Sequence, residues 1–429
     1  MGAVKHLLGR VWLTALLLCA GTTSASARQP LIVLDEGKYL HGVYPGSSIG
    51  NEDDFSCAMI NAYVGSVGRP VAWVYFSNNW FTEDAAVFPR GKVCDIHRLG
   101  AVPFIRLMLR PDTDKVKKDG RGPYSSKKFQ KYFANLDRIN EGKVDALLQR
   151  WGRDARDFKY PLIVEFGTEV NDKSHGWNAR YNGGPAGADK FKLAFRRVVD
   201  QVKNKAGAHN VIWVFHVTAG DSPDESWNRL ESYYPDDPAR PENDVVDWLG
   251  VSVYGAQKPK KEGDDDDNCP EFKPQMDDVY RRLNVMAPEQ PGRPAKPIFV
   301  LEFGETAGHP YAKRSEPKWQ RCKPEVWADA ALTAMLKTTS PTDAKNPWWP
   351  RLRGFSWWNE TWKDDGVVDM QVQHMPLLAE RFRHYLTAEP YSLMIVDSPR
   401  YMPDFTAPSD DPCLSVPVGA GCAAPAPRP

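Results

Sequence analysis

The sequence alternates eight short apolar runs with segments of helical periodicity. The apolar runs are residues 40–44, 71–76, 102–109, 162–167, 211–216, 248–254, 298–303 and 354–359. The segments with apolar residues at helical spacing are 140–157, 189–206, 272–286 and 324–337. Continuous apolar strands that alternate with amphipathic helices indicate a parallel sheet covered by helices. Eight such units favour an α/β fold of the closed (β/α)8 TIM-barrel type over an open, doubly wound sheet.

Residues 1–27 have the features of a signal peptide. Lys5 and Arg10 give a positive start, residues 11–20 are apolar, and Ala27 completes a small-residue cleavage site. The apolar run is too short to span a bilayer, which disfavours an uncleaved anchor. We therefore expect a secreted or periplasmic protein with no membrane partner after cleavage. The barrel should occupy residues 28–402, and the Pro/Ala-rich tail 403–429 should either run along the barrel or be disordered.

Six cysteines follow the expected cleavage site, and an even number in an exported chain indicates disulfides. Sequence alone leaves 15 pairings open for six cysteines. Our expectation joins nearest neighbours, as Cys57–Cys94, Cys269–Cys322 and Cys413–Cys422. The cysteine and histidine spacings of common metal sites are absent from the sequence, so we expect neither a metal nor another cofactor.

Charge and aromatic content bear on the partner. The formal net charge is zero, which does not indicate a nucleic-acid partner, and we expect a monomer. The chain has 15 Trp and 16 Tyr, enough to supply sugar-stacking surfaces as well as core. The long basic segment 110–138 and the acidic run 264–267 follow strand ends, where they either shape a substrate site or form solvated loops.

Two of the apolar runs end in glutamates beside a Phe-Gly step. Glu165 and Glu169 share one strand parity, whereas Glu302 and Glu305 have opposite parities. Active sites of TIM barrels lie at the C-terminal ends of the strands. Parity and position therefore select Glu169 and Glu302 for chemistry rather than as solvated loop residues. Glu165 should lie a layer deeper as a structural carboxylate, paired because a lone buried charge is costly.

These segments resemble the retaining glycoside hydrolases with (β/α)8 barrels, whose acid/base ends strand four and whose nucleophile ends strand seven. Within that clan, residues 41–386 are most similar to glycoside hydrolase family 26, the β-mannanase-type enzymes. The similarity is carried by segment 166–171 with the following Trp177, by segment 296–304 and by segment 354–359. Where the family usually has a histidine before its acid/base, this chain has Thr168.

The resemblance implies an endo-acting, retaining hydrolase of a β-linked polysaccharide, with β-mannan-type substrates favoured. It makes Glu169 the acid/base and Glu302 the nucleophile, and it places Tyr254 against the nucleophile and Trp358 or Trp357 beneath the sugar. Retention requires the two carboxyl groups to lie about 5–5.5 Å apart. Further candidates for contacts with the sugar are Asn171, His216, Arg106, Trp177, Tyr181 and Trp80.

Two other function classes stay open. A non-catalytic glycan-binding barrel would keep the aromatic residues but hold the two carboxyl groups too far apart. Residues 46–50 also fit the G-x-S-x-G pattern of a serine esterase, with Ser48 as nucleophile. That pattern follows the first apolar run, whereas an α/β-hydrolase needs earlier strands before its nucleophile. We therefore expect a turn at the barrel lip.

Overall fold

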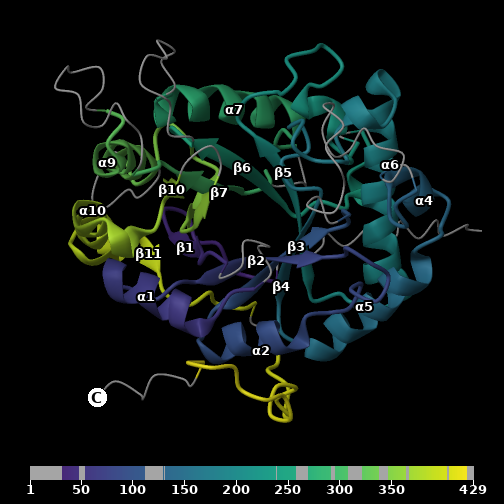
Figure 1. The fold of residues 1–429 in the computed structure, drawn as a ribbon, viewed down its shortest axis with the longest axis horizontal. Helices are drawn as coiled ribbons and strands as arrows, with labels where there is room; N and C mark the ends of the chain where they lie inside the picture. Colours follow the sequence, from purple (N-terminus) through teal and green to yellow (C-terminus); the bar gives the residue numbers. More distant parts are fainter. Residues whose placement is uncertain are drawn as a thin grey trace, which may run out of the picture.

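The computed structural model in Figure 1 describes most of the chain from residue 31 onward. The described residues are 31–47, 54–111, 129, 131–237, 239–257, 269–290, 295–307, 321–337, 346–363, 367–402 and 405–422. The expected signal peptide, Ser48, the acidic run 264–267, most of the basic segment 110–138 and the last residues of the tail lie outside this part.

Eight parallel strands form a closed barrel, which confirms the predicted TIM-barrel fold. The strands are β1 (Tyr39–Tyr44), β2 (Trp73–Asn79), β3 (Val102–Met108), β4 (Leu162–Phe166), β5 (Val211–Thr218), β6 (Trp248–Tyr254), β7 (Ile298–Gly304) and β8 (Leu352–Trp358). Each strand pairs with the next, and β1 pairs with β8, with Leu40 opposite Gly354 and Tyr44 opposite Trp358. All eight predicted runs are therefore strands.

Helices surround this barrel in Figure 1. They are α1 (Cys57–Val67), α2 (Arg90–Arg98), α4 (Leu136–Asn140), α5 (Asp145–Phe158), α6 (Gly187–Val199), α7 (Phe272–Met286), α9 (Pro324–Met335) and α10 (Pro376–Thr387). The expected helix 140–157 is in fact the end of α4 followed by α5. Gly142 separates them with a φ of 79°, a left-handed conformation that ends a helix. Helix α6 continues through a π-helical segment, Asp200–Lys205, so helical structure reaches nearly to the predicted end at residue 206.

Strand β2 extends three residues beyond the predicted apolar run. Ser77, Asn78 and Asn79 are polar, yet they stay in register with β3 and are buried. The Asn78 side chain accepts hydrogen bonds from two indole nitrogens, Trp80 Nε1 at 3.2 Å and Trp151 Nε1 at 3.0 Å. Buried polar groups are tolerated when they are hydrogen-bonded. A prediction from hydrophobicity alone therefore places the end of this strand three residues too early.

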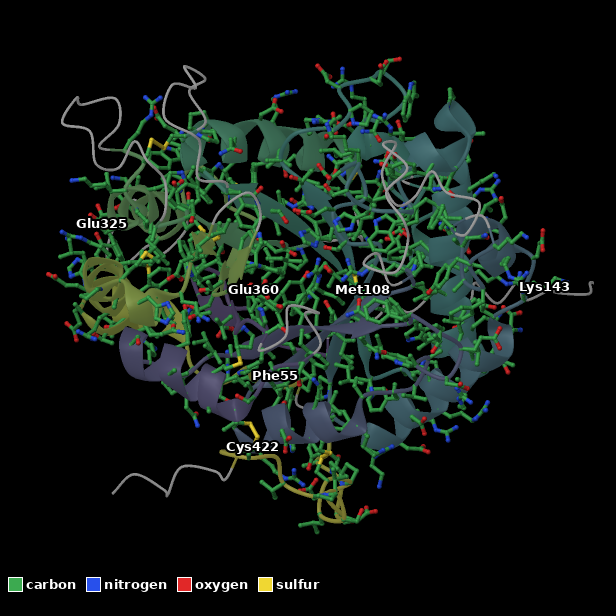
Figure 2. All side chains as sticks on the ribbon, in the orientation of Figure 1. Phe55, Met108, Lys143, Glu325, Glu360 and Cys422 are labelled. Atoms are coloured by element: carbon green, nitrogen blue, oxygen red, sulfur yellow. A yellow bond between two sulfur atoms is a disulfide. The ribbon has the colours of Figure 1, made fainter. Side chains whose placement is uncertain are left out.

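Two short additions flank the barrel. Strand β11 (Ile395–Val396) pairs in parallel with the start of β1. Strands β9 (Thr361–Lys363) and β10 (Val367–Asp369) form an antiparallel pair after β8. In Figure 2, Glu360 and Met108 are labelled near the middle of the molecule, whereas Lys143 and Glu325 are labelled near its edge. Among the described helices, none has the length and apolar character needed to cross a bilayer.

The C-terminal segment 405–422 is fastened to helices α1 and α2 by two disulfides. Cys57 pairs with Cys422 and Cys94 pairs with Cys413, so the expected pairs Cys57–Cys94 and Cys413–Cys422 are wrong. The expected pair Cys269–Cys322 is confirmed. Nearest-neighbour pairing fails because the closed barrel returns the end of the chain to its first two helices, which brings together cysteines more than 300 residues apart.

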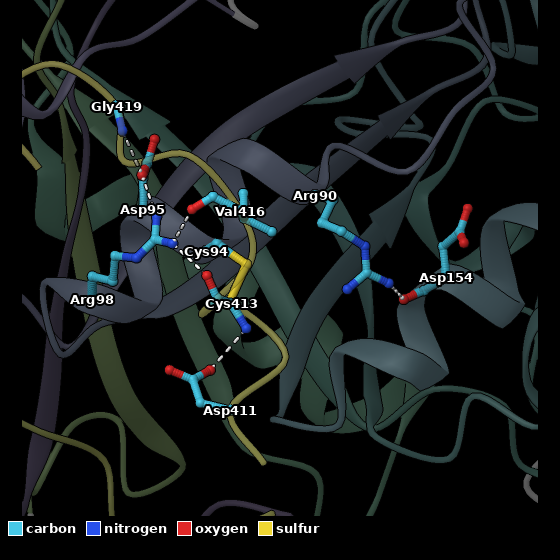
Figure 3. Close-up of a disulfide and its surroundings, with 9 residues drawn as sticks. All are labelled: Arg90, Cys94, Asp95, Arg98, Asp154, Asp411, Cys413, Val416 and Gly419. Atoms are coloured by element: carbon cyan, nitrogen blue, oxygen red, sulfur yellow. Dashed lines mark hydrogen bonds and ion pairs between the residues drawn. A yellow bond between two sulfur atoms is a disulfide. The ribbon is translucent and has the colours of Figure 1, made fainter.

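Polar contacts hold the same segment against α2 (Figure 3). Arg98 donates hydrogen bonds to the carbonyl oxygens of Cys413 at 2.5 Å and Val416 at 2.6 Å. Asp95 accepts from the backbone amide of Gly419 at 3.0 Å. Residues 405–422 therefore lie against helix α2.

Candidate active site

The segment carrying Glu169 leaves the barrel through a turn. Strand β4 ends at Phe166, and Gly167 and Glu169 have φ angles of 75° and 46°. A side chain at Gly167 would come within 2.4 Å of the Phe191 ring, so the close approach of α6 also requires glycine there. The strand-parity argument therefore does not apply to Glu169. Its position depends on this turn, with an unusual left-handed conformation at a non-glycine residue.

Glu302 lies near the C-terminal end of β7 and is 3% exposed. Tyr254, at the end of β6, donates a hydrogen bond of 2.9 Å to Glu302 Oε2. The Tyr75 hydroxyl oxygen lies 3.2 Å from Oε1, and a guanidinium nitrogen of Arg106 lies 3.6 Å from that same oxygen. Tyr254 thus contacts the proposed nucleophile, as the resemblance implies.

Burial sets the proton affinity of Glu302. Removal from water raises the pKa of Glu302 to about 7; the charge of Arg106 opposes this shift and that of Glu169 adds to it. The carboxyl therefore exchanges its proton near neutral pH.

Glu169 lies beside an imidazole. His175 Nε2 is 3.3 Å from Glu169 Oε2, and the His175 ring stacks on Trp177 with a centroid distance of 4.9 Å and an interplanar angle of 6°. Trp177 Nε1 donates to the carbonyl oxygen of Thr168 at 2.9 Å, which ties the stack to the turn. Burial raises the pKa of Glu169, but the hydrogen bond and charge of His175 outweigh it and lower the pKa to about 2.

A buried polar layer lies beneath the two glutamates. Glu165 is fully buried, and its Oε1 lies 3.4 Å from Arg106 Nε, so it is a paired buried carboxylate as expected. Its other oxygen accepts from His216 Nδ1 at 2.8 Å. Tyr75 donates to Glu165 Oε1 at 2.5 Å. Arg106 therefore lies between Glu165 and Glu302 and balances part of their charge.

His216, from β5, connects this layer to the turn and to β6. Its Nδ1 lies 2.9 Å from Thr168 Oγ1, and its Nε2 lies 2.9 Å from Ser252 Oγ. Ser252 stands opposite Glu302 in the β6–β7 register, at a bulge, and its hydroxyl helps to lower the pKa of Glu169. An imidazole is thus present beside Thr168, although it comes from the next strand.

The two tryptophans of β8 take different places. Trp358 stacks on Tyr44 with a centroid distance of 3.8 Å, and the Arg106 guanidinium lies 5.1 Å from its ring centroid. Trp357 is fully buried, and its Nε1 donates to the Met370 carbonyl at 2.6 Å. The described contacts bring Trp358, and not Trp357, to the carboxylate cluster.

Asn171 supports the turn. Its Nδ2 donates to the Thr218 carbonyl at 3.0 Å and to Asp221 Oδ1 at 2.9 Å. Its Oδ1 accepts from the Thr218 amide at 2.9 Å. These bonds fix the residues that follow Glu169. Tyr181 bonds the Lys173 carbonyl at 2.8 Å, and the described contacts do not bring it to the glutamates. The same is true of Trp80, which is fully buried.

Three residues of the site were missed from the sequence. Ser252 shares a strand face with Tyr254, so the alternation within β6 carries a signal for it. Tyr75 lies on a continuous apolar run, where a hydroxyl is not distinguished from core. His175 lies in an irregular segment, and no periodicity points to it. Tyr75 and Ser252 are close to Glu302 because separate strands converge in the closed barrel, whereas His175 lies only six residues after Glu169.

Within the described residues, one group could bring three metal-ligating atoms together. It consists of Cys57, Asp95 and Cys422, whose two sulfur atoms are bonded to each other. Both thiols are therefore consumed, and the group does not fit a metal ion.

Comparison with known proteins supports the fold. No protein-family model and no curated protein matches the sequence. The solved structure of GH26C from a Muricauda species is similar, with a TM-score of 0.51 and 12% identity over 84% of this chain and 87% of that chain.

Two further matches have lower TM-scores. A β-mannanase from a symbiotic protist of the termite Reticulitermes speratus, complexed with gluco-manno-oligosaccharide, has a TM-score of 0.48 and 14% identity over 84% of this chain and 88% of that chain. Mannanase man26 from Bacillus subtilis has a TM-score of 0.47 and 14% identity over 79% of this chain and 84% of that chain. At this level of identity, the likeness to GH26C shows that the two chains share a fold.

Proposed function

We propose that the protein is a retaining glycoside hydrolase of the family 26 type that cleaves a β-linked polysaccharide, with β-mannan as the first candidate. The observation that carries the proposal is the pair of glutamates at the ends of β4 and β7, with Tyr254 and Arg106 on Glu302 and His175 on Glu169. Two carboxyl groups with pKa values displaced in opposite directions are typical of active sites that cleave glycosidic bonds.

Each glutamate has a separate role in the double displacement. Glu302, once ionised, attacks the anomeric carbon and forms a glycosyl-enzyme, while Glu169 gives its proton to the departing oxygen. Glu169 then removes a proton from water, and the hydroxide formed releases the sugar with net retention. Arg106 and Tyr254 stabilise the Glu302 carboxylate, and Trp358 is the expected floor of the sugar site.

The two glutamates influence each other's proton affinity, because the charge of Glu169 contributes to the raised pKa of Glu302. The two carboxyls titrate as a coupled pair, so a pH–rate profile reports the pair rather than either residue. Catalysis requires Glu302 to be ionised and Glu169 to be protonated when the glycosidic bond breaks.

The test is reducing-end release from a panel of β-mannan, xylan, β-glucan and acidic polysaccharides. Activity on one glycan should be abolished in Glu302→Ala and in Glu169→Ala, and retained in Glu141→Ala, which removes an exposed carboxyl. Azide should restore turnover of an activated glycoside to Glu169→Ala, because it attacks the glycosyl-enzyme without a general base. Full activity in either glutamate variant refutes the assignment, and binding of a glycan without cleavage by the wild type supports the glycan-binding barrel.

We also propose that the protein works as a monomer outside the cytoplasm. Three disulfides among the described residues support an oxidising compartment, either the periplasm or the exterior. Mass spectrometry of the natively produced protein tests the expected start at residue 28.

A further inference from the structure

The backbone at the proposed acid/base has an unusual conformation. Glu169 has a φ of 46°, in the left-handed region that residues with a side chain rarely adopt. Such a conformation persists only where the surrounding contacts hold it. Because β4 ends at Phe166, the direction of the Glu169 side chain depends on the contacts that fix this turn.

Hydrogen bonds hold the turn on both sides of Glu169. Before it, the Thr168 carbonyl accepts from Trp177 Nε1 at 2.9 Å. After it, the Val170 amide donates to the His216 carbonyl at 3.2 Å. The second bond joins two backbone groups, whereas the first depends on the indole of Trp177. A substitution at Trp177 therefore releases the backbone immediately before Glu169.

Trp177 also holds the side-chain partner of Glu169. The His175 ring lies nearly parallel to the indole, with a centroid distance of 4.9 Å and an interplanar angle of 6°. Its Nε2 is 3.3 Å from Glu169 Oε2. Trp177 itself is 3% exposed. The protein thus uses the indole N–H and one ring face internally, and little of the ring is left for a sugar.

We propose that Trp177 is a positioning residue for Glu169 and not a stacking platform for the leaving sugar. This inference rests on the proposed function, in which Glu169 protonates the departing oxygen and later takes a proton from the attacking water. Both steps require the carboxyl within hydrogen-bonding reach of the reacting oxygen, and a misplacement of about 1 Å can cost about 100-fold in rate. Trp177 limits such a displacement through the Thr168 carbonyl and through the His175 ring.

The two roles of Trp177 can be separated because the leaving sugar takes part only in the first step. The variant is Trp177→Phe, which keeps an aromatic face for His175 and removes the N–H that bonds Thr168. The probe is 2,4-dinitrophenyl β-mannobioside, whose leaving group departs without a proton and is not a sugar. Its kcat/KM reports formation of the glycosyl-enzyme. Its kcat reports hydrolysis of that intermediate, and a burst of dinitrophenolate shows that the intermediate accumulates.

In Trp177→Phe, kcat on this probe should fall by about tenfold or more, while kcat/KM stays within about threefold of the wild-type value. The preserved kcat/KM shows a folded protein with a working nucleophile. Azide should restore kcat, because it attacks the glycosyl-enzyme without a general base. An unchanged kcat overturns the proposal, and if kcat/KM on β-1,4-mannan then falls, Trp177 is a platform for the leaving sugar. Equal losses of kcat and kcat/KM, or no effect of azide, also overturn it.

Trp327→Phe is the matched control. Trp327, on α9, is likewise 3% exposed, and its Nε1 donates to the Pro270 carbonyl at 2.9 Å. This variant should keep kcat on the dinitrophenyl glycoside at the wild-type level, and a loss equal to that of Trp177→Phe overturns the proposal.

The proposed function fails differently from this inference. The wild type then releases no dinitrophenolate from the probe, or Glu302→Ala releases it at the wild-type rate. Either result removes the role of Glu169 as acid/base and overturns the positioning role of Trp177 with it.

Discussion

His175 Nε2 lies 3.3 Å from Oε2 of Glu169, six residues earlier in the same segment. The contact joins a residue of an irregular segment to the proposed acid, and the stacking of His175 on Trp177 holds the imidazole in place. It stabilises the ionised form of a residue whose first task in the proposed mechanism is to donate a proton. The next prediction addresses this conflict.

Removal of the imidazole should move the pH optimum upward. In His175→Ala the hydrogen bond and charge that lower the pKa of Glu169 are lost, so this pKa rises. Protonated Glu169 then persists to higher pH, and the basic limb of the kcat/KM profile on β-mannan shifts the same way. His374→Ala removes an exposed histidine that contacts Asp369 and serves as the control. A basic limb that does not move in His175→Ala contradicts the prediction.

Tyr254→Phe should weaken catalysis through the nucleophile. The hydroxyl donates to Glu302 at 2.9 Å, and a hydrogen bond to a charged group is worth about 1.5–3 kcal/mol. We therefore expect kcat/KM on β-mannan to fall by about 10- to 100-fold with little change in thermal stability. The control is Tyr63→Phe, a fully buried tyrosine whose hydroxyl bonds His41 at 2.8 Å away from the glutamates. Equal losses of kcat/KM in both variants would count against a specific role for Tyr254.

Glu305 should make stability depend on pH. It is fully buried, its carboxyl accepts from the Ala256 amide, and burial raises the pKa well above the ordinary 4.5. Neutral Glu305 in the folded state becomes ionised on unfolding. Its contribution to stability is therefore complete below pH 4.5 and is lost as the pH rises toward the folded pKa.

A comparison with Glu305→Gln measures that effect, because the amide keeps an acceptor oxygen for Ala256 and cannot ionise. The free energy of unfolding of the wild type should fall relative to the Gln variant by about 1.4 kcal/mol per pH unit above the ordinary pKa. Urea unfolding between pH 5 and pH 8 supplies the difference. A constant difference across this range would show that Glu305 is ionised in the folded protein.

The two tail disulfides should stabilise the fold non-additively. Together the two disulfides close one large ring of the chain and one short ring, which runs from Cys57 to Cys94 and from Cys413 to Cys422. Removing either disulfide opens only the short ring, because the other disulfide still closes a large one. Loop entropy assigns this opening about 4 kcal/mol, and loss of both pairs about 2 kcal/mol more than the sum of the two single losses. Guanidinium unfolding of the Cys→Ser pairs tests this.

The Cys269–Cys322 pair, which closes 53 residues elsewhere on the barrel, provides the control for that cycle. Its removal should add independently to either tail variant. Strict additivity between the two tail disulfides would contradict the account based on a shared ring.

The barrel was predictable because each strand is a separate, local signal. All eight apolar runs are strands, and helix α7 has the predicted bounds of 272–286. The errors occur where a local pattern is interrupted by backbone conformation or by a distant partner. Gly142 divides one predicted helix, and the turn at Gly167 ends β4 before the parity argument reaches Glu169.

The polar layer could be predicted only in part. Glu165 was expected to be buried and paired, because an isolated buried charge is costly, and it contacts Arg106. The identity of its other partners depends on which strands are neighbours and on their register. Ser252 stands opposite Glu302 only through the register shift between β6 and β7, and no sequence pattern encodes that shift. The prediction of two disulfide pairs fails for the same reason, since the pairing depends on where the two ends of the chain meet.

The fastening of the tail also affects what a protease can do to this protein. A single cut of the backbone between Cys94 and Cys413 leaves the two fragments joined through both Cys57–Cys422 and Cys94–Cys413. Six of the eight barrel strands, β3 to β8, lie between Cys94 and Cys413. A molecule cut once would therefore run as a single band on a non-reducing gel and separate into two fragments only after reduction. Its strands would remain covalently linked while it is exposed to a protease. The C-terminal segment 405–422 is therefore covalently linked to both of the first two helices, α1 and α2.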